Sequence, residues 1–292
     1  HNRAEQLTEL ILPTSALPYE DTVKINLPFH MSSMDKYKPS TEAGLFRWLN
    51  SHTMAENYVL SYKLDGISAL LITNDRGVKR LLTKGRSGVG MDISRHIPYL
   101  YEVSNVACPP NSYVRGELIL PRIDPLTGKD YNNSRNLVAG AMKEKQSSPI
   151  VNNIHFVAYE CCGNCAVRPP LLSQLQTLES WGFETVARES RLYSKTDLTI
   201  AALSTLLDKW RNNNQYIVDG IIIAHNKEYT PVTRGNPKHA AAFKKIMEDQ
   251  QAVTEVVDVH WAVSKDGFLK PRVQLEPVVI GGARYEFTSG FN

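Results

Sequence analysis

The chain of 292 residues carries 33 Lys and Arg against 30 Asp and Glu, and 42% of its residues are hydrophobic. This length suffices for a sizeable core in one large domain or two smaller ones, and the formal net charge of +3 permits binding to nucleic acid without requiring it. No apolar run approaches the roughly eighteen residues of a membrane-spanning helix, and no charged-then-apolar leader opens the chain. We therefore expect an intracellular protein that does not enter a membrane.

Hydrophobic periodicity, taken in chain order, predicts an α+β layout. In the first half, we expect helices over Ala4–Leu12 and Ser40–Leu49, and strands over Val59–Thr73 and Val78–Thr83 around a turn at Asn74–Gly77. In the second half, we expect a short helix over Arg135–Lys145, a strand over Ile154–Tyr159, and helices over Leu171–Trp181 and Asp197–Asn212. Glu248–Gln251 is the expected linker, and beyond Ala252 the pattern contains only strands and turns.

The four cysteines, Cys108, Cys161, Cys162 and Cys165, are too few for the disulfide framework of a secreted domain. Cys162 and Cys165 have the spacing of metal ligands, but a tetrahedral zinc site needs two more soft ligands and none lies close in the sequence. We therefore expect reduced thiols and no metal-binding cluster of side chains.

A lysine embedded in an apolar run is the first candidate for chemistry. Lys63-Leu64-Asp65-Gly66 lies between Tyr58-Val59-Leu60 and Ile67–Ile72, so a strand would hold this lysine rigidly beside a glycine that permits a turn. Apolar neighbours disfavour the charged form of an amine, and only the neutral amine is a nucleophile. The pattern fits a covalent lysine nucleophile, although so short a motif also occurs by chance as a lysine at a strand end.

Further charged groups interrupt apolar strands downstream, in a fixed order. They are Arg115-Gly116-Glu117, then Asp219-Gly220, then Lys244-Lys245. Charges within strand-length apolar runs cost free energy unless they are paired or serve a ligand. This series resembles the nucleotidyltransferase motifs of polynucleotide ligases and capping enzymes.

Several longer segments narrow the resemblance to NAD-dependent DNA ligases, including their viral and phage relatives. Thr83–Ile93, Asn133–Asn136 with Ala139-Gly140, and Gly267–Val278 are similar to segments of that family. The resemblance implies an ATP-grasp-like nucleotidyltransferase domain of antiparallel sheets with flanking helices over residues 1–249. It also implies the first strands of an OB-fold over residues 250–292.

The resemblance also implies a role for each matching residue. Lys63 would carry AMP, with Asp65, Asp219 and Lys244 as its catalytic partners. The expected contacts to the nucleotide come from Lys84, Glu117, Arg135, Tyr159 and Arg211. Of these, Glu117 would accept from a ribose hydroxyl, Tyr159 would stack on adenine, and Arg135 and Arg211, with Lys244, would neutralise the α-phosphate. Asp65 and Asp219 would steer the 3′-hydroxyl of DNA or a hydrated Mg²⁺ ion.

The implied function is a DNA ligase that takes AMP from NAD and seals 5′-phosphate/3′-hydroxyl nicks in duplex DNA through lysyl-AMP. Mg²⁺ is the implied metal cofactor and nicked double-stranded DNA the implied partner. Three basic clusters, Lys79 to Arg86, Arg135 to Lys145 and Lys265 to Arg272, are expected on the DNA-facing side. We expect a monomer that works in the cytoplasm or nucleoid, or at replication sites.

Departures from the family pattern keep other functions open. Ser61 stands where a glutamate contacts adenine, Ala224 replaces a lysine, and Lys84 and Lys143 stand where arginines are usual. The module that binds nicotinamide mononucleotide in bacterial enzymes has no match in residues 1–21, whereas Asn26–Lys36 resembles viral and phage ligases. The alternatives are an ATP-dependent DNA or RNA ligase, a capping-type nucleotidyltransferase, and a nick-binding module that does not seal.

Overall fold

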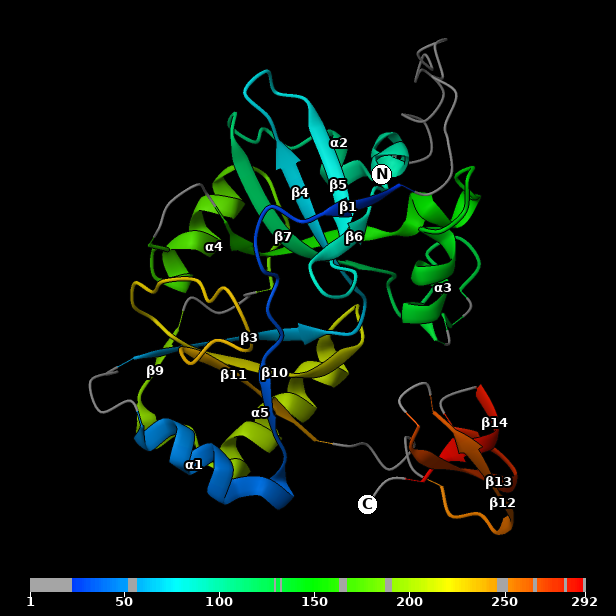
Figure 1. Cartoon of the computed structure of the whole chain (residues 1–292). Helices are drawn as coiled ribbons and strands as arrows, with labels where there is room; N and C mark the ends of the chain where they lie inside the picture. The colour runs from blue at the N-terminus through cyan, green and yellow to red at the C-terminus, as the bar shows by residue number, and fades with distance from the viewer. Residues whose placement is uncertain are drawn as a thin grey trace.

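The computed structural model describes residues 23–51, 57–128, 130–131, 133–162, 167–186, 191–245, 252–264, 267–280 and 283–290. Two antiparallel-rich sheets face each other in its main body (Figure 1). The predicted helix over Ala4–Leu12 and the predicted linker over Glu248–Gln251 lie outside these residues. The predicted α+β class is confirmed.

The first sheet has five strands. Its order is β2 (Asp35–Tyr37), β11 (Ala240–Lys244), β10 (Val218–His225), β3 (Tyr58–Leu64) and β9 (Leu192–Tyr193), with only the β2–β11 pair parallel. Helices α1 (Glu42–Asn50) and α5 (Ile200–Asn213) cover the face that points away from the second sheet (Figure 1). In α5, Leu203, Leu207 and Trp210 recur at helical spacing and are buried.

The second sheet has four strands, all antiparallel. Its order is β5 (Lys79–Thr83), β4 (Ile67–Thr73), β7 (Ser112–Ile119) and β8 (His155–Cys161). Helices α2 (Tyr101–Ser104) and α4 (Leu171–Ser180) pack on β8, and α3 (Ser134–Ala141) packs on β7. As predicted, α4 ends just before Gly182, whose φ of +93° suits glycine.

Shorter elements complete the described part of the chain. They are β1 (Lys24–Asn26) paired with β6 (Val89–Met91), and the 3₁₀ turns η2 (Pro39–Thr41), η3 (Ser94–Tyr99), η4 (Pro149–Asn153) and η5 (Lys195–Asp197). Beyond residue 252, β12 (Val256–Val263), β13 (Leu269–Ile280) and β14 (Ala283–Ser289) form a three-stranded antiparallel sheet. The expectation of strands and turns alone in this region is confirmed for its described residues.

The predicted strand over Val59–Thr73 is wrong in one respect, because the chain breaks it at Asp65-Gly66. The two halves, β3 and β4, belong to different sheets. Gly66 lies so close to β7 that an added Cβ would be 2.2 Å from the Leu118 carbonyl oxygen. A side chain at this position would collide with the backbone of β7, so glycine is required where the chain passes from one sheet to the other.

Candidate active site

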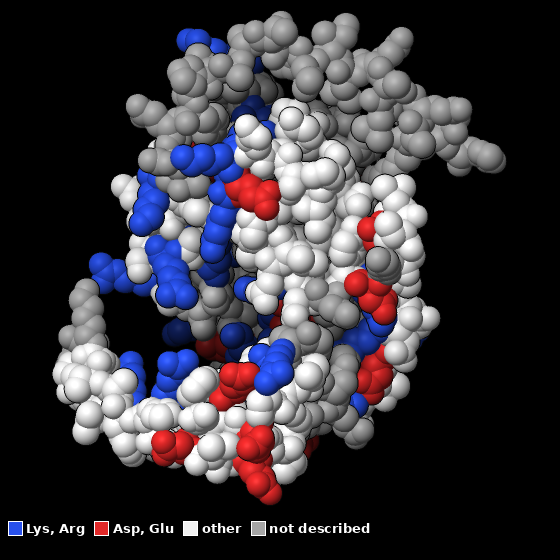
Figure 2. Space-filling view, turned by 90° about the vertical axis from the view of Figure 1, so that its right-hand side faces the viewer, with Lys and Arg blue, Asp and Glu red and all other residues white. Residues whose placement is uncertain are grey.

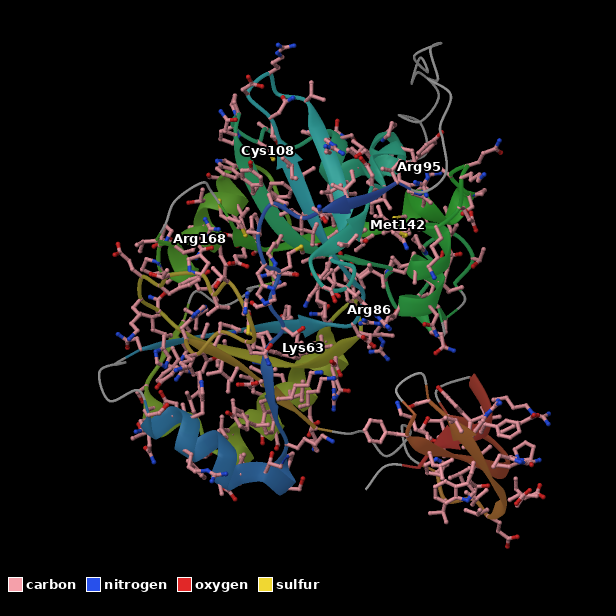
Figure 3. The ribbon with its side chains drawn as sticks, viewed as in Figure 1. Lys63, Arg86, Arg95, Cys108, Met142 and Arg168 are labelled. Atoms are coloured by element: carbon pink, nitrogen blue, oxygen red, sulfur yellow. The ribbon has the colours of Figure 1, made fainter. Side chains whose placement is uncertain are left out.

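A cavity of about 530 Å³ lies between the two sheets. Figure 3 shows Lys63 on β3, between the sheets. Both sheets, the loop after β5 and α3 contribute to the lining. The residues predicted from the sequence that line it are Lys63, Asp65, Lys84, Glu117, Arg135, Tyr159, Asp219 and Lys244. The structure therefore brings together every predicted site residue except Arg211.

Three neighbouring strands place two lysines on one carboxylate. Gly220 of β10 is in register with Lys63 of β3 and with Lys244 of β11, which sets Asp219 between the two. The Nζ atoms of Lys63 and Lys244 lie 2.6 and 2.5 Å from the same oxygen, Oδ2 of Asp219. Burial alone would raise the pKa of Asp219, but the two lysines outweigh it and lower the pKa. Asp219 is thus an ionised anchor for two ammonium groups.

Glu117 on β7 faces this group from the opposite sheet. Its Oε1 accepts a hydrogen bond of 3.2 Å from the backbone N–H of Gly66. Burial raises the pKa of Glu117 to about 7, although the positive charges of Lys63 and Arg135 oppose the shift. A carboxyl group with a pKa near neutrality can accept from a hydroxyl group when ionised and donate to it when protonated.

Arg135 and Asp65 form the solvent-facing edge of the cavity. The Arg135 Nη1 lies 3.0 Å from Asp65 Oδ1, and their side chains are 54% and 38% exposed. At this exposure the pair contributes little to stability, so both charges can exchange this partner for a ligand. Arg135 lies in α3, whose start at Ser134 matches the predicted short helix.

Tyr159 presents an aromatic ring held from two sides. Its hydroxyl is 2.5 Å from Ser68 Oγ, and the Arg115 guanidinium lies 5.4 Å from the ring centroid. Burial raises the pKa of Tyr159 to about 12, so the phenol stays neutral. A neutral ring in a fixed orientation is a suitable stacking partner for a planar base.

Sequence reasoning missed the charge network that supports this ring. Arg115 is buried, its Nη1 lies 2.6 Å from Glu160 Oε2, and the Tyr229 hydroxyl donates to Glu160 Oε1 at 3.0 Å. The sequence contains a signal for this network, because Arg115 belongs to the motif of Glu117 and Glu160 follows Tyr159, each within an apolar strand. Paired and buried charges of this kind fix the geometry around them.

The segment before β2 closes one side of the cavity. The Ser32 carbonyl oxygen accepts from Arg115 Nη2 at 3.1 Å and from Lys84 Nζ at 3.2 Å, and Lys84 also donates to Ser33 Oγ at 2.7 Å. Burial lowers the pKa of Lys84, and the nearby Arg115 lowers it further. Lys84 therefore lines the cavity while it donates hydrogen bonds to the segment that closes one side of the cavity.

The structure places Arg211 outside the cavity that holds the other predicted site residues. It does not line the cavity. Its guanidinium donates instead to the backbone carbonyl oxygens of Val218 at 3.0 Å, Asp219 at 3.3 Å and Lys245 at 2.7 Å. Spacing relative to Asp219 could place Arg211 near the site but could not show whether it faces a ligand or the backbone.

The first predicted basic cluster is exposed only in part. Lys79 donates to the carbonyl oxygens of Val103, Ser104 and Val106, which satisfies the C-terminal end of α2. Arg80 pairs with Asp92 at 2.8 Å. Lys79 therefore acts within the fold, whereas Arg80 and Arg86 of the same cluster are exposed.

The second cluster is exposed. Arg135, Lys143 and Lys145 are exposed at and just after α3. Figure 2 shows Lys and Arg side chains gathered on one flank of the face that carries α3. Among the described residues of the third cluster, Lys270 is exposed and Arg272 lies over the Phe287 ring at 4.1 Å from its centroid.

Two facing sheets enclose the site. One sheet carries two lysines around an ionised aspartate, and the other carries a carboxyl group and an aromatic ring in a fixed orientation. This is the arrangement of the adenylation domain of a nucleotidyltransferase. Residues 23–246 match the family model described as the NAD-dependent DNA ligase adenylation domain. The chain belongs to this family, and membership implies NAD as the adenylate donor.

Known relatives agree with this assignment. The chain is 33% identical over 280 residues to a DNA ligase of Acanthamoeba polyphaga mimivirus, which covers 92% of this chain and 41% of the relative. It is 25% identical over 269 residues to a DNA ligase of Leptospira interrogans serovar Lai, covering 85% of this chain and 38% of the relative. The chain thus spans less than half the length of the curated relatives it matches.

A solved structure named Pmar-Lig_Pre is similar in fold. Its TM-score is 0.56 at 14% sequence identity, with 89% of this chain and 57% of that chain covered. At this identity the likeness concerns the fold alone. Among the described residues, no helix is both long enough and apolar enough to cross a membrane.

Proposed function

We propose that this chain transfers AMP from NAD to Lys63, and that the protein containing it passes the AMP to the 5′-phosphate of a nick and seals the strand. The observation that carries this proposal is the placement of Lys63 beside Lys244 on one oxygen of Asp219, within a cavity that also holds Glu117 and Tyr159.

In the proposed reaction, the neutral amine of Lys63 attacks the α-phosphorus of NAD. A phosphorus–nitrogen bond forms while the bond to nicotinamide mononucleotide breaks. The ammonium group of Lys63 first releases a proton to solvent and leaves its ion pair with Asp219, since only the neutral amine is nucleophilic, and the nitrogen releases a second proton to solvent as the phosphorus–nitrogen bond forms. Lys244 then remains as the fixed positive charge nearest the reacting phosphate, where negative charge accumulates.

The remaining residues would bind and orient the nucleotide. Glu117 would bind a ribose hydroxyl and Tyr159 would stack on adenine, which their positions on the opposite sheet support. Arg135 and Lys84 would bind phosphate oxygens. Arg211 is not included among the direct contacts.

Mg²⁺ would be held mainly by water and by the nucleotide phosphates. Within the described ranges, no group of three or more His, Cys, Asp or Glu side chains could hold a metal ion, so an all-protein cage is not available there. Asp65 is the more exposed carboxylate of the site and would contact the hydrated ion, which keeps several waters. The ion would neutralise charge on the α-phosphate.

Nicked duplex DNA is the proposed partner. Arg135, Lys143 and Lys145 are exposed on the side of α3, where they could bind backbone phosphates. We propose that residues 1–249 form the adenylation domain and that β12 to β14 begin an OB-fold over residues 250–292. We further propose a monomer that acts inside the cell at sites of DNA replication or repair.

Covalent labelling tests the nucleophile. The protein is incubated with NAD carrying ³²P at the α-phosphate of its AMP half, denatured, and separated by electrophoresis. We expect label on the wild type and on Lys245→Ala, whose side chain pairs with Asp208 outside the cavity, but none on folded Lys63→Ala. Label on Lys63→Ala at the wild-type level would refute the assignment.

The same assay decides between cofactors. The family assignment predicts faster labelling from NAD than from α-labelled ATP, with nicotinamide mononucleotide as the product. Equal or faster labelling from ATP, with release of pyrophosphate, would favour the ATP-dependent alternative.

A further inference from the structure

Arg211 bonds to the two strands that carry Asp219 and Lys244. It lies in the last turn of α5. Nε donates to the Val218 carbonyl oxygen at 3.0 Å, and Nη2 donates to the carbonyl oxygens of Asp219 at 3.3 Å and Lys245 at 2.7 Å. One guanidinium therefore contacts the backbone of Asp219 itself and of the residue that follows Lys244.

These carbonyl groups lie where regular strand pairing stops. The β10–β11 ladder reaches only as far as Gly220 and Lys244. On the other side of β10, the pairing with β3 is irregular between Val218 and Gly220, so Asp219 sits at a β-bulge. A bulge leaves part of the backbone without its ladder bonds and re-aims the side chain at that position. Arg211 supplies donors to the backbone at this bulge.

The position of the Asp219 side chain depends on this backbone. Its Oδ2 binds Lys63 and Lys244 at 2.6 and 2.5 Å, so a small rotation of the bulge would break one bond or both. A guanidinium can make several bonds in a fixed planar geometry, whereas the ammonium of a lysine is a point charge on a flexible stem. Arginine is therefore suited to fix both strands at once.

We propose that Arg211 is a positioning residue for adenylation: it fixes the bulge at Asp219 against the end of β11, so that Asp219 holds Lys63 and Lys244 in reactive geometry. This inference rests on the proposed function. It replaces a direct contact between Arg211 and the α-phosphate, which the sequence had predicted.

The same helix offers a matched control. Asp208 precedes Arg211 by one turn of α5 and pairs with the Lys245 side chain at 2.7 Å. The two side chains are 47% and 38% exposed, so this pair contributes little. Asp208→Asn removes a charge contact between α5 and the end of β11 but leaves the carbonyl contacts of Arg211 in place.

The experiment compares wild type, Asp208→Asn, Arg211→Met and Arg211→Lys in single-turnover labelling of Lys63 over a range of NAD concentrations. Misplacement of reacting groups by about 1 Å costs on the order of 100-fold in rate. We expect the maximal labelling rate of Arg211→Met to fall about 10- to 100-fold, with the half-saturating NAD concentration within about threefold of wild type. Arg211→Lys should recover only part of the rate, and Asp208→Asn should match the wild type.

A loss of NAD affinity at an unchanged maximal rate would overturn the inference, because that pattern indicates a direct ligand contact. A wild-type rate in Arg211→Met would also overturn it. If Arg211→Met does not fold, Arg211→Lys decides in the same way: a maximal rate reduced at least severalfold supports positioning, and an unchanged rate refutes it.

Hydrogen exchange of the same proteins separates this inference from the proposed function. We expect faster exchange of the backbone amides over residues 218–221 and 243–245 in the Arg211 variants than in Asp208→Asn, even in the absence of NAD. Faster exchange together with no labelling of the wild type would refute the proposed function, and with it the role in adenylation, while it would retain the conclusion that Arg211 fixes the bulge at Asp219. Unchanged exchange would refute the positioning role.

Discussion

Replacing Glu117 with glutamine should change how stability depends on pH. Burial raises the pKa of Glu117 to about 7 from an ordinary value of 4.5. Between these two values, the folded protein keeps a proton on Glu117 that the unfolded chain has released. Stability from this group is therefore complete below about pH 4.5 and is lost as pH rises through about 7.

The magnitude follows from the shift. The two pKa values differ by about 2.5, and at about 1.4 kcal/mol per pKa unit the upper bound is about 3.5 kcal/mol; Glu117 is only partly buried, so we expect about 2 kcal/mol. Glutamine has nearly the same shape and no titration. The free energy of unfolding of Glu117→Gln, relative to wild type, should therefore rise by about 2 kcal/mol between pH 5 and pH 8.

Urea unfolding at pH 5, 6, 7 and 8 measures this difference directly. All other titrating groups are shared by the two proteins, so their contributions cancel in the comparison. Parallel stability curves for wild type and Glu117→Gln across this range would show that Glu117 titrates at its ordinary pKa and that the cavity does not desolvate it.

Two further substitutions test the packing around the site. Asp219→Asn removes the charge that two ammonium groups share. Since hydrogen bonds to charged groups contribute about 1.5–3 kcal/mol each, urea unfolding should show a loss of about 2–4 kcal/mol in the free energy of unfolding. An unchanged midpoint would contradict the ion-pair geometry. Gly116→Ala would place a Cβ 2.5 Å from the buried Phe156 ring, so thermal unfolding should show a loss of about 1–3 kcal/mol. The matched control is Gly140→Ala in α3, where no atom of a neighbouring segment lies within 4 Å; it should be neutral or stabilising by up to about 1 kcal/mol, and equal losses at the two glycines would contradict the packing argument.

Much of the site could be predicted from the sequence, because its charged residues stand out from their apolar neighbours. Lys63, Glu117 and Asp219 each interrupt an apolar strand, and a charge in that setting is retained only where it is paired or binds a ligand. The strands themselves were predictable from the same apolar runs. The structure adds that β7 lies in one sheet and β3 and β10 lie in the other.

The rest depended on tertiary contacts that no local pattern contains. Val59–Thr73 is apolar on both sides of Lys63–Gly66, and although Gly66 permits a turn, the passage of the chain from one sheet to the other at this point becomes evident only from the strand pairing and from the close approach of the Leu118 carbonyl. Arg211 occupies the end of an amphipathic helix, where arginines usually face solvent. Its contacts are set by the bulge in β10, which lies in a different element. Lys79 likewise lies in a basic run but binds the end of a helix.

The passage of the chain from one sheet to the other has a mechanical consequence. Lys63 and Ser68 are five residues apart, yet one lies on the five-stranded sheet and the other on the four-stranded sheet. In the proposed binding mode, a nucleotide with its phosphate at Lys63 and its base on Tyr159 contacts both sheets and connects them. The spacing of the sheets then sets the attack distance. Core substitutions that shift one sheet, far from any nucleotide atom, should slow adenylation while they leave every residue of the site unchanged.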